Sequence, residues 1–152
     1  MNTIQIDKML NRNSVTKKYY IGCYASNCIP SKSTYSPFCA VINIDPNDSP
    51  GTHWVAIFCD SIKTIEYYDS LGIWPPMSSH IRDYLEKFQR VRYNSIRLQG
   101  MFKRSCGHHA IFYLYMRCSG FDMNEIISFL KNINADKFVT EFIASKIFNI
   151  HS

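Results

Sequence analysis

The chain has 152 residues, which suits one domain and leaves little room for a second, so residues 1–152 are treated as a single domain. Hydrophobic residues make up 46% and charged residues 19% of the sequence, ordinary values for a globular chain that buries a core. The formal net charge of +5 is a mild basic excess that is compatible with a nucleic-acid partner and does not demand one.

The cysteines and the apolar runs exclude several classes of protein. None of the six cysteines lies in a C-x-x-C pair, and no Cys/His cluster has zinc spacing, so no metal site is predicted. Residues 1–13 are polar and lack the apolar segment of a signal peptide, which favours free thiols in a reducing compartment over secretion, although the even number leaves disulfides open. No apolar run approaches the length of a membrane span, so we expect no membrane partner.

The chain begins with a predicted helix and a predicted loop. Residues 3–12 indicate a short helix with Thr3 as its cap, because apolar residues recur at helical spacing at Ile6, Met9 and Leu10. Residues 19–37 are rich in turn-forming residues and are typical of a loop.

The middle of the chain predicts three strands. Phe38–Ile44 is β-branched and apolar, which is typical of a buried strand, and two prolines and a glycine break the chain within residues 45–51. Residues 53–60 and 64–70 indicate two further strands, and the short connection at 61–63 predicts that they form a hairpin.

The remainder of the chain is mostly helical. After a turn at 71–76, residues 78–90 predict an amphipathic helix with a Ser cap, whose apolar face is formed by Ile81, Tyr84, Leu85 and Phe88. Residues 91–98 indicate another strand. Residues 106–117 predict a helix that is apolar nearly all round and therefore buried, with a stop at Gly120. Two more helices are predicted at 122–133 and 135–148. Strands in the middle with helices at both ends indicate an α+β domain with a small, mostly antiparallel sheet.

Two of the candidate functional residues lie at the ends of the predicted hairpin. His53 begins the second strand and Asp69 ends the third, so pairing of these strands makes the two residues neighbours at one sheet edge. A carboxylate behind an imidazole fixes its tautomer and orientation, as in a catalytic triad.

The other two candidates, Cys106 and Gln99, lie at and before the start of the buried helix. Cys106 begins this helix, where the helix dipole and unpaired backbone N–H groups favour a thiolate. A neighbouring imidazole can take the thiol proton and return it to a leaving amine. Gln99 lies seven residues before Cys106, and its amide N–H, with the backbone N–H of Cys106, could stabilise an oxyanion.

Each of these residues also has an ordinary structural explanation. A histidine that begins a strand is usually a surface residue, an aspartate before a turn is often only a turn former, and cysteine is commonly buried. His108 and His109 lie on the helix, too close to Cys106 in sequence to face it, so we interpret them as packing or surface residues. The ordered set His, Asp, Gln, Cys, each at the end of the right element, favours the catalytic interpretation.

The motifs that carry this set resemble a known family. The segments "GTHWVAIF", "IEYYDSLG" and "QGMFKRSCG", with "YYIGCY" and "FCAVIN" before them, resemble the adenovirus-type cysteine proteases (adenain), which are related to proteases of SUMO and ubiquitin-like modifiers. The resemblance covers roughly the first 120 residues and implies a papain-like fold with the nucleophile at the start of a buried central helix. It implies that Cys106 is the nucleophile, His53 the base, Asp69 the orienting carboxylate and Gln99 the oxyanion donor, with Trp54 as a wall of the site.

Two departures from the family pattern concern the carboxylate and the activator. Asp69 stands where adenovirus enzymes have Glu and SUMO-type proteases have Asp. Adenain is activated by viral DNA and by a short viral peptide tethered through a cysteine, whereas "VRYNSIR" here contains no cysteine. The resemblance therefore implies that the chemistry needs no cofactor, and it leaves a viral peptide and weakly bound, non-specific DNA as candidate activators.

Three functions remain in competition at this point. The first is a monomeric cysteine endopeptidase of a DNA virus or a Polinton/Maverick-type element, which cleaves viral precursor polypeptides near glycine during virion maturation, in the virion and the host nucleus or cytoplasm. The second is a deconjugating protease for a ubiquitin-like modifier, which Asp69 favours. The third is a binding module on an inactive protease scaffold, which the intact set of four residues disfavours.

Overall fold

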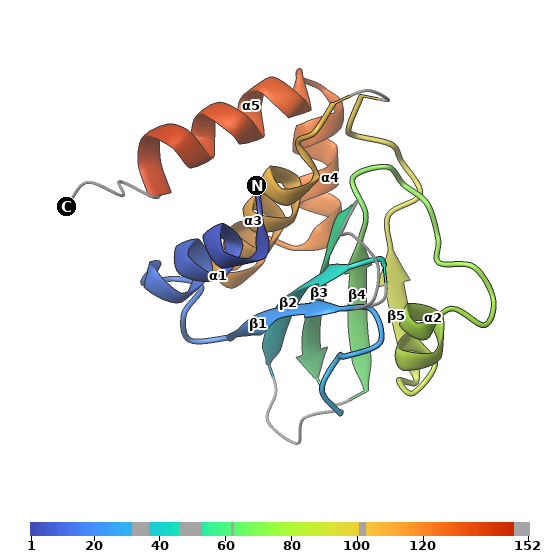
Figure 1. Ribbon diagram of the computed structural model, residues 1–152. Helices are drawn as coiled ribbons and strands as arrows, with labels where there is room; N and C mark the ends of the chain where they lie inside the picture. The colour runs from blue at the N-terminus through green and yellow to red at the C-terminus, as the bar shows by residue number, and fades with distance from the viewer. Residues whose placement is uncertain (32–36, 46–52, 62, 101–102, 148–152) are drawn as a thin grey trace.

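A single sheet of five strands forms the centre of the computed structural model, which describes residues 1–31, 37–45, 53–61, 63–100 and 103–147 (Figure 1). The strands are ordered β1-β2-β3-β4-β5 across the sheet. The elements in chain order are α1 (Thr3–Arg12), β1 (Tyr20–Ala25), β2 (Phe38–Asn43), β3 (Trp54–Ser61), β4 (Thr64–Tyr68), α2 (His80–Leu85), β5 (Arg90–Tyr93), α3 (Cys106–Cys118), α4 (Met123–Lys131), α5 (Ala135–Phe142) and a π-helical turn at Ile143–Ile147.

The sheet is mixed, with its antiparallel pairs at the centre. Strand β3 is antiparallel to both β2 and β4, so the predicted hairpin is present, whereas the outer pairs β1–β2 and β4–β5 are parallel. The expected α+β class is confirmed, but the sheet is not mostly antiparallel. The parallel edges arise because β1 and β5 are each joined to their neighbours by long connections, and only such connections return a strand in the same direction.

Strand β1 lies within residues 19–37, for which a loop was predicted, and that prediction was wrong for Tyr20–Ala25. The register shifts between Tyr20 and Gly22, where Gly22 has a φ of +146°. A Cβ on Gly22 would lie 2.7 Å from the Tyr24 hydroxyl oxygen, so this irregularity requires glycine. An edge strand with a glycine irregularity and mostly half-exposed side chains carries a weak strand pattern.

The helix boundaries differ from the predictions at three places. The cap of α1 is Asn2, not Thr3: its side chain accepts the N–H of Gln5 at 2.9 Å, and the Gln5 side chain accepts the N–H of Asn2 at 2.9 Å. Helix α2 has the predicted Ser79 cap but covers only His80–Leu85 of the predicted range 78–90. The predicted break at 45–51 lies largely outside the described residues. The last predicted helix, 135–148, is α-helical only over Ala135–Phe142 and continues as the π-helical turn Ile143–Ile147, while residue 148 lies outside the described residues.

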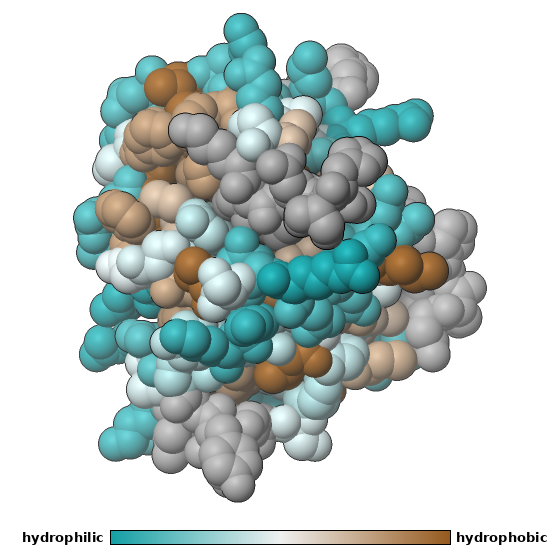
Figure 2. All heavy atoms as spheres, turned by 90° about the vertical axis from the view of Figure 1, so that its left-hand side faces the viewer, coloured by the Kyte–Doolittle hydropathy of each residue, from teal (hydrophilic) through white to brown (hydrophobic). Residues whose placement is uncertain are grey.

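The sheet buries a hydrophobic cluster on each face. Helices α1, α3, α4 and α5 pack against one face, and α2 packs against the other, which Figure 1 shows as two unequal layers. All six residues of β2 are buried, as expected for a strand covered on both sides. Among the described helices, none combines the length and apolar character needed to cross a membrane. Hydrophilic side chains cover much of the face in Figure 2, the side of α1, with apolar ones between them.

An ion pair between a buried carboxylate and a half-buried arginine fixes the direction of α3 against the sheet. Glu66 of β4 is 1% exposed and accepts hydrogen bonds from Arg117 at 2.8 Å (Nε to Oε1) and 3.0 Å (Nη2 to Oε2). Tyr113 of α3 also donates its hydroxyl proton to Glu66. Arg117 lies near the C-terminal end of α3, so this contact anchors that end over the middle of β4. The other end of α3, which begins with Cys106, is directed toward the sheet edge where β3 begins and β4 ends.

Candidate active site

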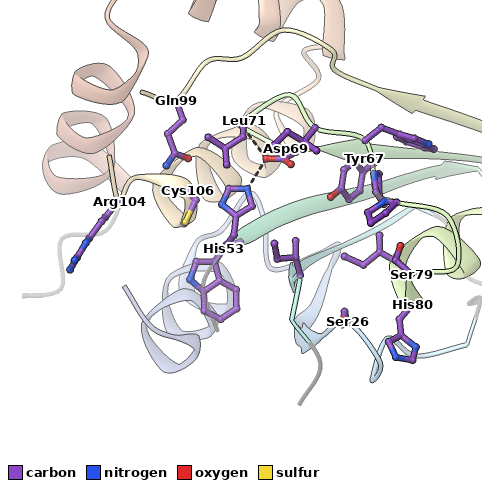
Figure 3. Close-up of a pocket in the computed structure, with 18 of the residues that line it drawn as sticks. Ser26, His53, Tyr67, Asp69, Leu71, Ser79, His80, Gln99, Arg104 and Cys106 are labelled. Carbon is purple, nitrogen blue, oxygen red and sulfur yellow. Dashed lines mark hydrogen bonds and ion pairs between the residues drawn. The ribbon is translucent and has the colours of Figure 1, made fainter. Parts of the chain in front are cut away.

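His53 and Asp69 meet at the end of the sheet where β3 begins and β4 ends, as their positions in the hairpin predicted. His53 directly precedes β3 and Asp69 directly follows β4, and the two strands are antiparallel. The Nε2 atom of His53 lies 2.6 Å from Oδ1 of Asp69, and both residues are buried, at 7% and 4% exposure (Figure 3). The same Asp69 oxygen accepts the backbone N–H of Leu71 at 2.9 Å. A carboxylate that holds Nε2 leaves the Nδ1 atom of His53 free to face another group.

Asn94 holds the backbone of Asp69 in place, a role that the sequence did not indicate. Its Oδ1 accepts the N–H of Asp69 at 2.9 Å, and its Nδ2 donates to the carbonyl of Asp69 at 2.6 Å and to that of Ile96 at 3.2 Å. Asn94 directly follows β5, which pairs with β4. Three residues after Asp69 the chain turns at Gly72, which has a φ of +69° and donates its N–H to the Asp69 carbonyl at 2.8 Å.

Cys106 begins α3 and its thiol contacts His53. Burial alone would lower the pKa of His53, but the hydrogen bonds to Asp69 and Cys106 raise it to about 9. Burial alone would raise the pKa of the Cys106 thiol, but the His53 hydrogen bond and the backbone N–H groups of Trp54 and Gly107 lower it below its usual value. Opposite shifts in the two partners favour a thiolate–imidazolium pair, the reactive form of a cysteine nucleophile.

Gln99 is buried beside Cys106 and both ends of its amide are held. Its Oε1 accepts the Ser70 hydroxyl at 2.6 Å, and its Nε2 donates to the carbonyl of Lys103 at 2.6 Å. The backbone N–H of Gln99 also donates to the Ser70 carbonyl at 2.9 Å. In Figure 3 the Gln99 amide points toward Cys106. An Nε2 atom has two protons, so one remains for a group bound at the thiol.

The four predicted site residues line one open cleft of about 970 Å³. Trp54 and Gly107 form its wall next to the nucleophile, and a Cβ on Gly107 would lie 3.4 Å from the Trp54 ring. Apolar side chains line the part beyond His53, among them Leu71, Ile73 and Trp74. Within the described residues, no group of three or more His, Cys, Asp or Glu side chains could hold a metal ion.

The histidines after Cys106 do not take part in this constellation. His109 is fully buried, contacts Tyr68 and Asp136, and lies inside the domain, while His108 is half-buried beside it. Neither is an alternative base for Cys106, in agreement with the sequence interpretation. The hydrogen-bonding partners Ser70, Asn94 and Asp136 escaped the sequence analysis because no motif distinguishes a polar residue that supports a site from one on the surface.

Comparisons with known proteins find similarity to cysteine proteases. No protein-family model matches the chain. The cysteine protease of African swine fever virus is 30% identical over 109 residues, covering 64% of this chain and 40% of the viral protein. The chain therefore spans less than half the length of this relative.

Solved structures agree with the sequence comparison. The crystal structure of the African swine fever virus protease matches with a TM-score of 0.53 and 26% identity, over 70% of this chain and 42% of the other. The SUMO protease Ulp1, with its catalytic cysteine oxidised to a sulfinic acid, matches with a TM-score of 0.53 and 18% identity, over 94% of this chain and 78% of the other. The expected resemblance is thus confirmed: the chain is homologous to a viral cysteine protease and has the fold of the SUMO-type cysteine proteases.

Proposed function

We propose that the chain is a cysteine protease in which Cys106 is the nucleophile, His53 the acid–base, Asp69 its orienting carboxylate and Gln99 an oxyanion donor. The observation that carries the proposal is the convergence of these four side chains in one cleft, with a 2.6 Å contact between His53 and Asp69 and the thiol against the other side of the imidazole. A binding module would need none of the four in this relation.

The proposed reaction proceeds in two steps, acylation of Cys106 and hydrolysis of the resulting thioester. The Cys106 thiolate attacks the carbonyl carbon of a peptide bond, and the negative charge on the carbonyl oxygen is met by the Gln99 amide and the backbone N–H of Cys106. The C–N bond then breaks, the leaving amine takes the His53 proton, and an acyl thioester remains. Water, deprotonated by His53, attacks the thioester, and release of the acid regenerates thiolate and imidazolium. Asp69 keeps the imidazole ring in the required orientation throughout.

The proposed substrates are viral precursor polypeptides cleaved next to glycine. Support comes from the wall beside Cys106, where Met1 and the Trp54 ring pack against Gly107 and border the cleft next to the nucleophile. The similarity to an African swine fever virus protein supports a viral role. Maturation inside a virion, in the host nucleus or cytoplasm, and action as a monomer belong to the same proposal.

Activation by DNA and by a viral peptide is also part of the proposal, while the chemistry itself uses only side chains and water. Six exposed basic residues lie between α2 and α3 and provide positive charge for phosphates: Lys87, Arg90, Arg92, Arg97, Lys103 and Arg104. Two of them, Lys103 and Arg104, line the cleft itself. Non-specific contact with DNA would then bring phosphates to the border of the substrate site.

One experiment separates the proposed function from its alternative. The protein and its Cys106→Ala variant are incubated with a library of peptides containing Gly-Gly and, in parallel, with reporters in which a ubiquitin-like modifier is joined to an amine. Cleavage of peptides that requires Cys106 supports an endopeptidase, whereas cleavage of the modifier reporters alone would assign the site to deconjugation. No Cys106-dependent cleavage of either would contradict a protease function.

A further inference from the structure

A second histidine–carboxylate pair, formed by a buried histidine and a partly exposed aspartate, lies one helical turn behind Cys106. His109 of α3 is 0% exposed, with Nε2 at 3.0 Å from Oδ1 of Asp136 and Nδ1 at 3.2 Å from the hydroxyl oxygen of Tyr68. A carboxylate only accepts hydrogen bonds, so the proton resides on Nε2 and the Nδ1 atom accepts the proton of Tyr68. Burial lowers the pKa of His109 in spite of Asp136, so the ring is neutral and satisfied on both sides.

Asp136 also binds both ends of the segment between Gln99 and Cys106. Its Oδ2 accepts the backbone N–H of Gly100 at 2.9 Å, and its Oδ1 accepts the Ser105 hydroxyl at 2.6 Å. Gly100 directly follows the oxyanion donor, and Ser105 directly precedes the nucleophile. One carboxylate from α5 therefore connects the two residues whose spacing determines how Gln99 faces Cys106.

The first turn of α3 is not capped by a side chain. Ser105 occupies the N-cap position with φ −98° and ψ 10° instead of the usual extended conformation, its side chain makes no capping hydrogen bond, and its hydroxyl donates to Asp136. A serine in this position usually accepts an N–H of the first turn. Here that turn retains its donors, and the N–H of Gly107 contacts the Cys106 sulfur.

The fit around Gly100 is close. A Cβ at this position would lie 3.2 Å from Oδ2 of Asp136 and 3.0 Å from Cγ of Lys103. The carbonyl of Lys103 is the group that accepts the Gln99 amide proton. Gly100 is thus packed against the Asp136 carboxylate and the Lys103 side chain, and the Lys103 carbonyl is bound by the Gln99 amide.

We propose that Asp136 is a positioning residue of the active site, which sets the distance between the Gln99 amide and the Cys106 sulfur by holding Gly100, Ser105 and His109 together. The inference rests on the proposed protease function. It assigns a role in catalysis to α5, a helix that contributes no side chain to the cleft.

The test is the Asp136→Asn variant, whose amide cannot accept from all three donors that face it. We expect kcat to fall roughly 10- to 100-fold with KM unchanged, because a small displacement of a reacting group has that effect on rate. Alkylation of Cys106 by iodoacetamide needs the thiolate and not the oxyanion donor, so its rate should stay at the wild-type value. Asp122→Asn is the matched control, since Asp122 also begins a helix and accepts backbone N–H groups, but α4 contributes nothing to the cleft.

A double-mutant cycle distinguishes positioning from general stability. If Asp136 acts through the oxyanion donor, Asp136→Asn should have little further effect on kcat in a Gln99→Ala background. A structural role would instead reduce activity in both backgrounds alike and lower the alkylation rate with it, which would overturn the proposal. If the aspartate variant does not fold, Ser105→Ala serves as the test. It removes only one of the contacts of Asp136 and should give a smaller loss of kcat.

Hydrogen exchange separates failure of this inference from failure of the proposed function. The amide of Gly100 should exchange faster in Asp136→Asn, and in Asp122→Asn it should exchange as in the wild type. This measurement needs no substrate. Unchanged protection of Gly100 would overturn the positioning role even in an active protease, whereas a wild-type protein that cleaves no peptide would contradict the proposed function.

Discussion

Replacement of Asp69 by asparagine should change the pH dependence of the site, because Asp69 holds the proton on His53. Against the effect of burial, Asp69 and Cys106 raise the pKa of His53 from 6.5 to about 9. This difference corresponds to about 3 kcal/mol in favour of the imidazolium. Asp69→Asn preserves the shape of the side chain but removes its charge, so much of that stabilisation should be lost.

The direction of the change follows from the two pKa shifts. In the wild type the imidazolium is fully present below pH 6.5 and is lost as the pH rises through about 9, while the lowered pKa of Cys106 increases the share of thiolate. We expect kcat/KM to decline near pH 9, where His53 has no proton for the leaving amine. In Asp69→Asn this decline should move toward pH 6.5, and the thiol pKa should rise toward its ordinary value, since the two groups titrate as a pair.

The assay combines two profiles of each variant. The dependence of kcat/KM on pH, measured with a fluorogenic peptide, reports the alkaline decline, and the alkylation rate of Cys106, followed by mass spectrometry, reports the thiolate. Each unit by which the thiol pKa rises should reduce the alkylation rate at neutral pH about tenfold. Asp83→Asn, an exposed carboxylate on α2, is the control and should change neither profile. A folded Asp69→Asn variant that still declines near pH 9 would refute the role of Asp69 in charging His53.

The remaining predictions concern the nucleophile, the oxyanion donor, the core and DNA. Cys106→Ala should abolish turnover, and iodoacetamide should label Cys106 before the other five thiols; loss of activity in step with labelling of another cysteine would reject the assignment. Gln99→Ala should lower kcat roughly 10²–10³-fold with little change in KM, and an effect on KM alone would make Gln99 a substrate contact. Glu66→Gln should reduce the free energy of unfolding by about 1.5–3 kcal/mol, measured in urea, because half-buried Arg117 loses its charged partner and keeps only the exposed Asp60 carboxylate at 4.0 Å; an unchanged free energy of unfolding would contradict this account. Binding of fluorescent duplex DNA should weaken linearly on a log–log plot against salt, and no binding at low salt would remove DNA from the mechanism.

The local part of the site could be predicted from the sequence because its geometry follows from a hairpin. The short connection between Ser61 and Thr64 favours pairing of β3 with β4, and pairing brings the residue before β3 beside the residue after β4. The contact between His53 and Asp69 is therefore a consequence of local chain geometry. The position of Cys106 at a helix start is local in the same sense, since helical spacing of apolar residues marks where α3 begins.

The two edge strands, β1 and β5, could not be predicted correctly, because their bounds depend on contacts between residues distant in sequence. Strand β1 is recognisable only through its parallel pairing with β2, and Gly22 interrupts the strand pattern of its own segment. Strand β5 was expected over residues 91–98, but only Arg90–Tyr93 pairs with β4, because Asn94 leaves the strand to bind the backbone of Asp69. Strand β1 is thus determined by its pairing with β2, and the end of β5 by the contact of Asn94 with Asp69.

Asp136 is the strongest case of this limit. It follows Ser105 by 31 positions, and neither its residue type nor its spacing separates it from Asp122, which also stands at the start of a helix. Its role becomes visible only when α5 packs against α3 and brings the carboxylate to Gly100, Ser105 and His109. The motifs recognised in the sequence all lie before residue 120, ahead of α4 and α5, yet the proposed positioning of Gln99 against Cys106 depends on a residue beyond that point. The helices after residue 120 are therefore expected to matter for the rate of the reaction, even though the reacting groups all lie before them.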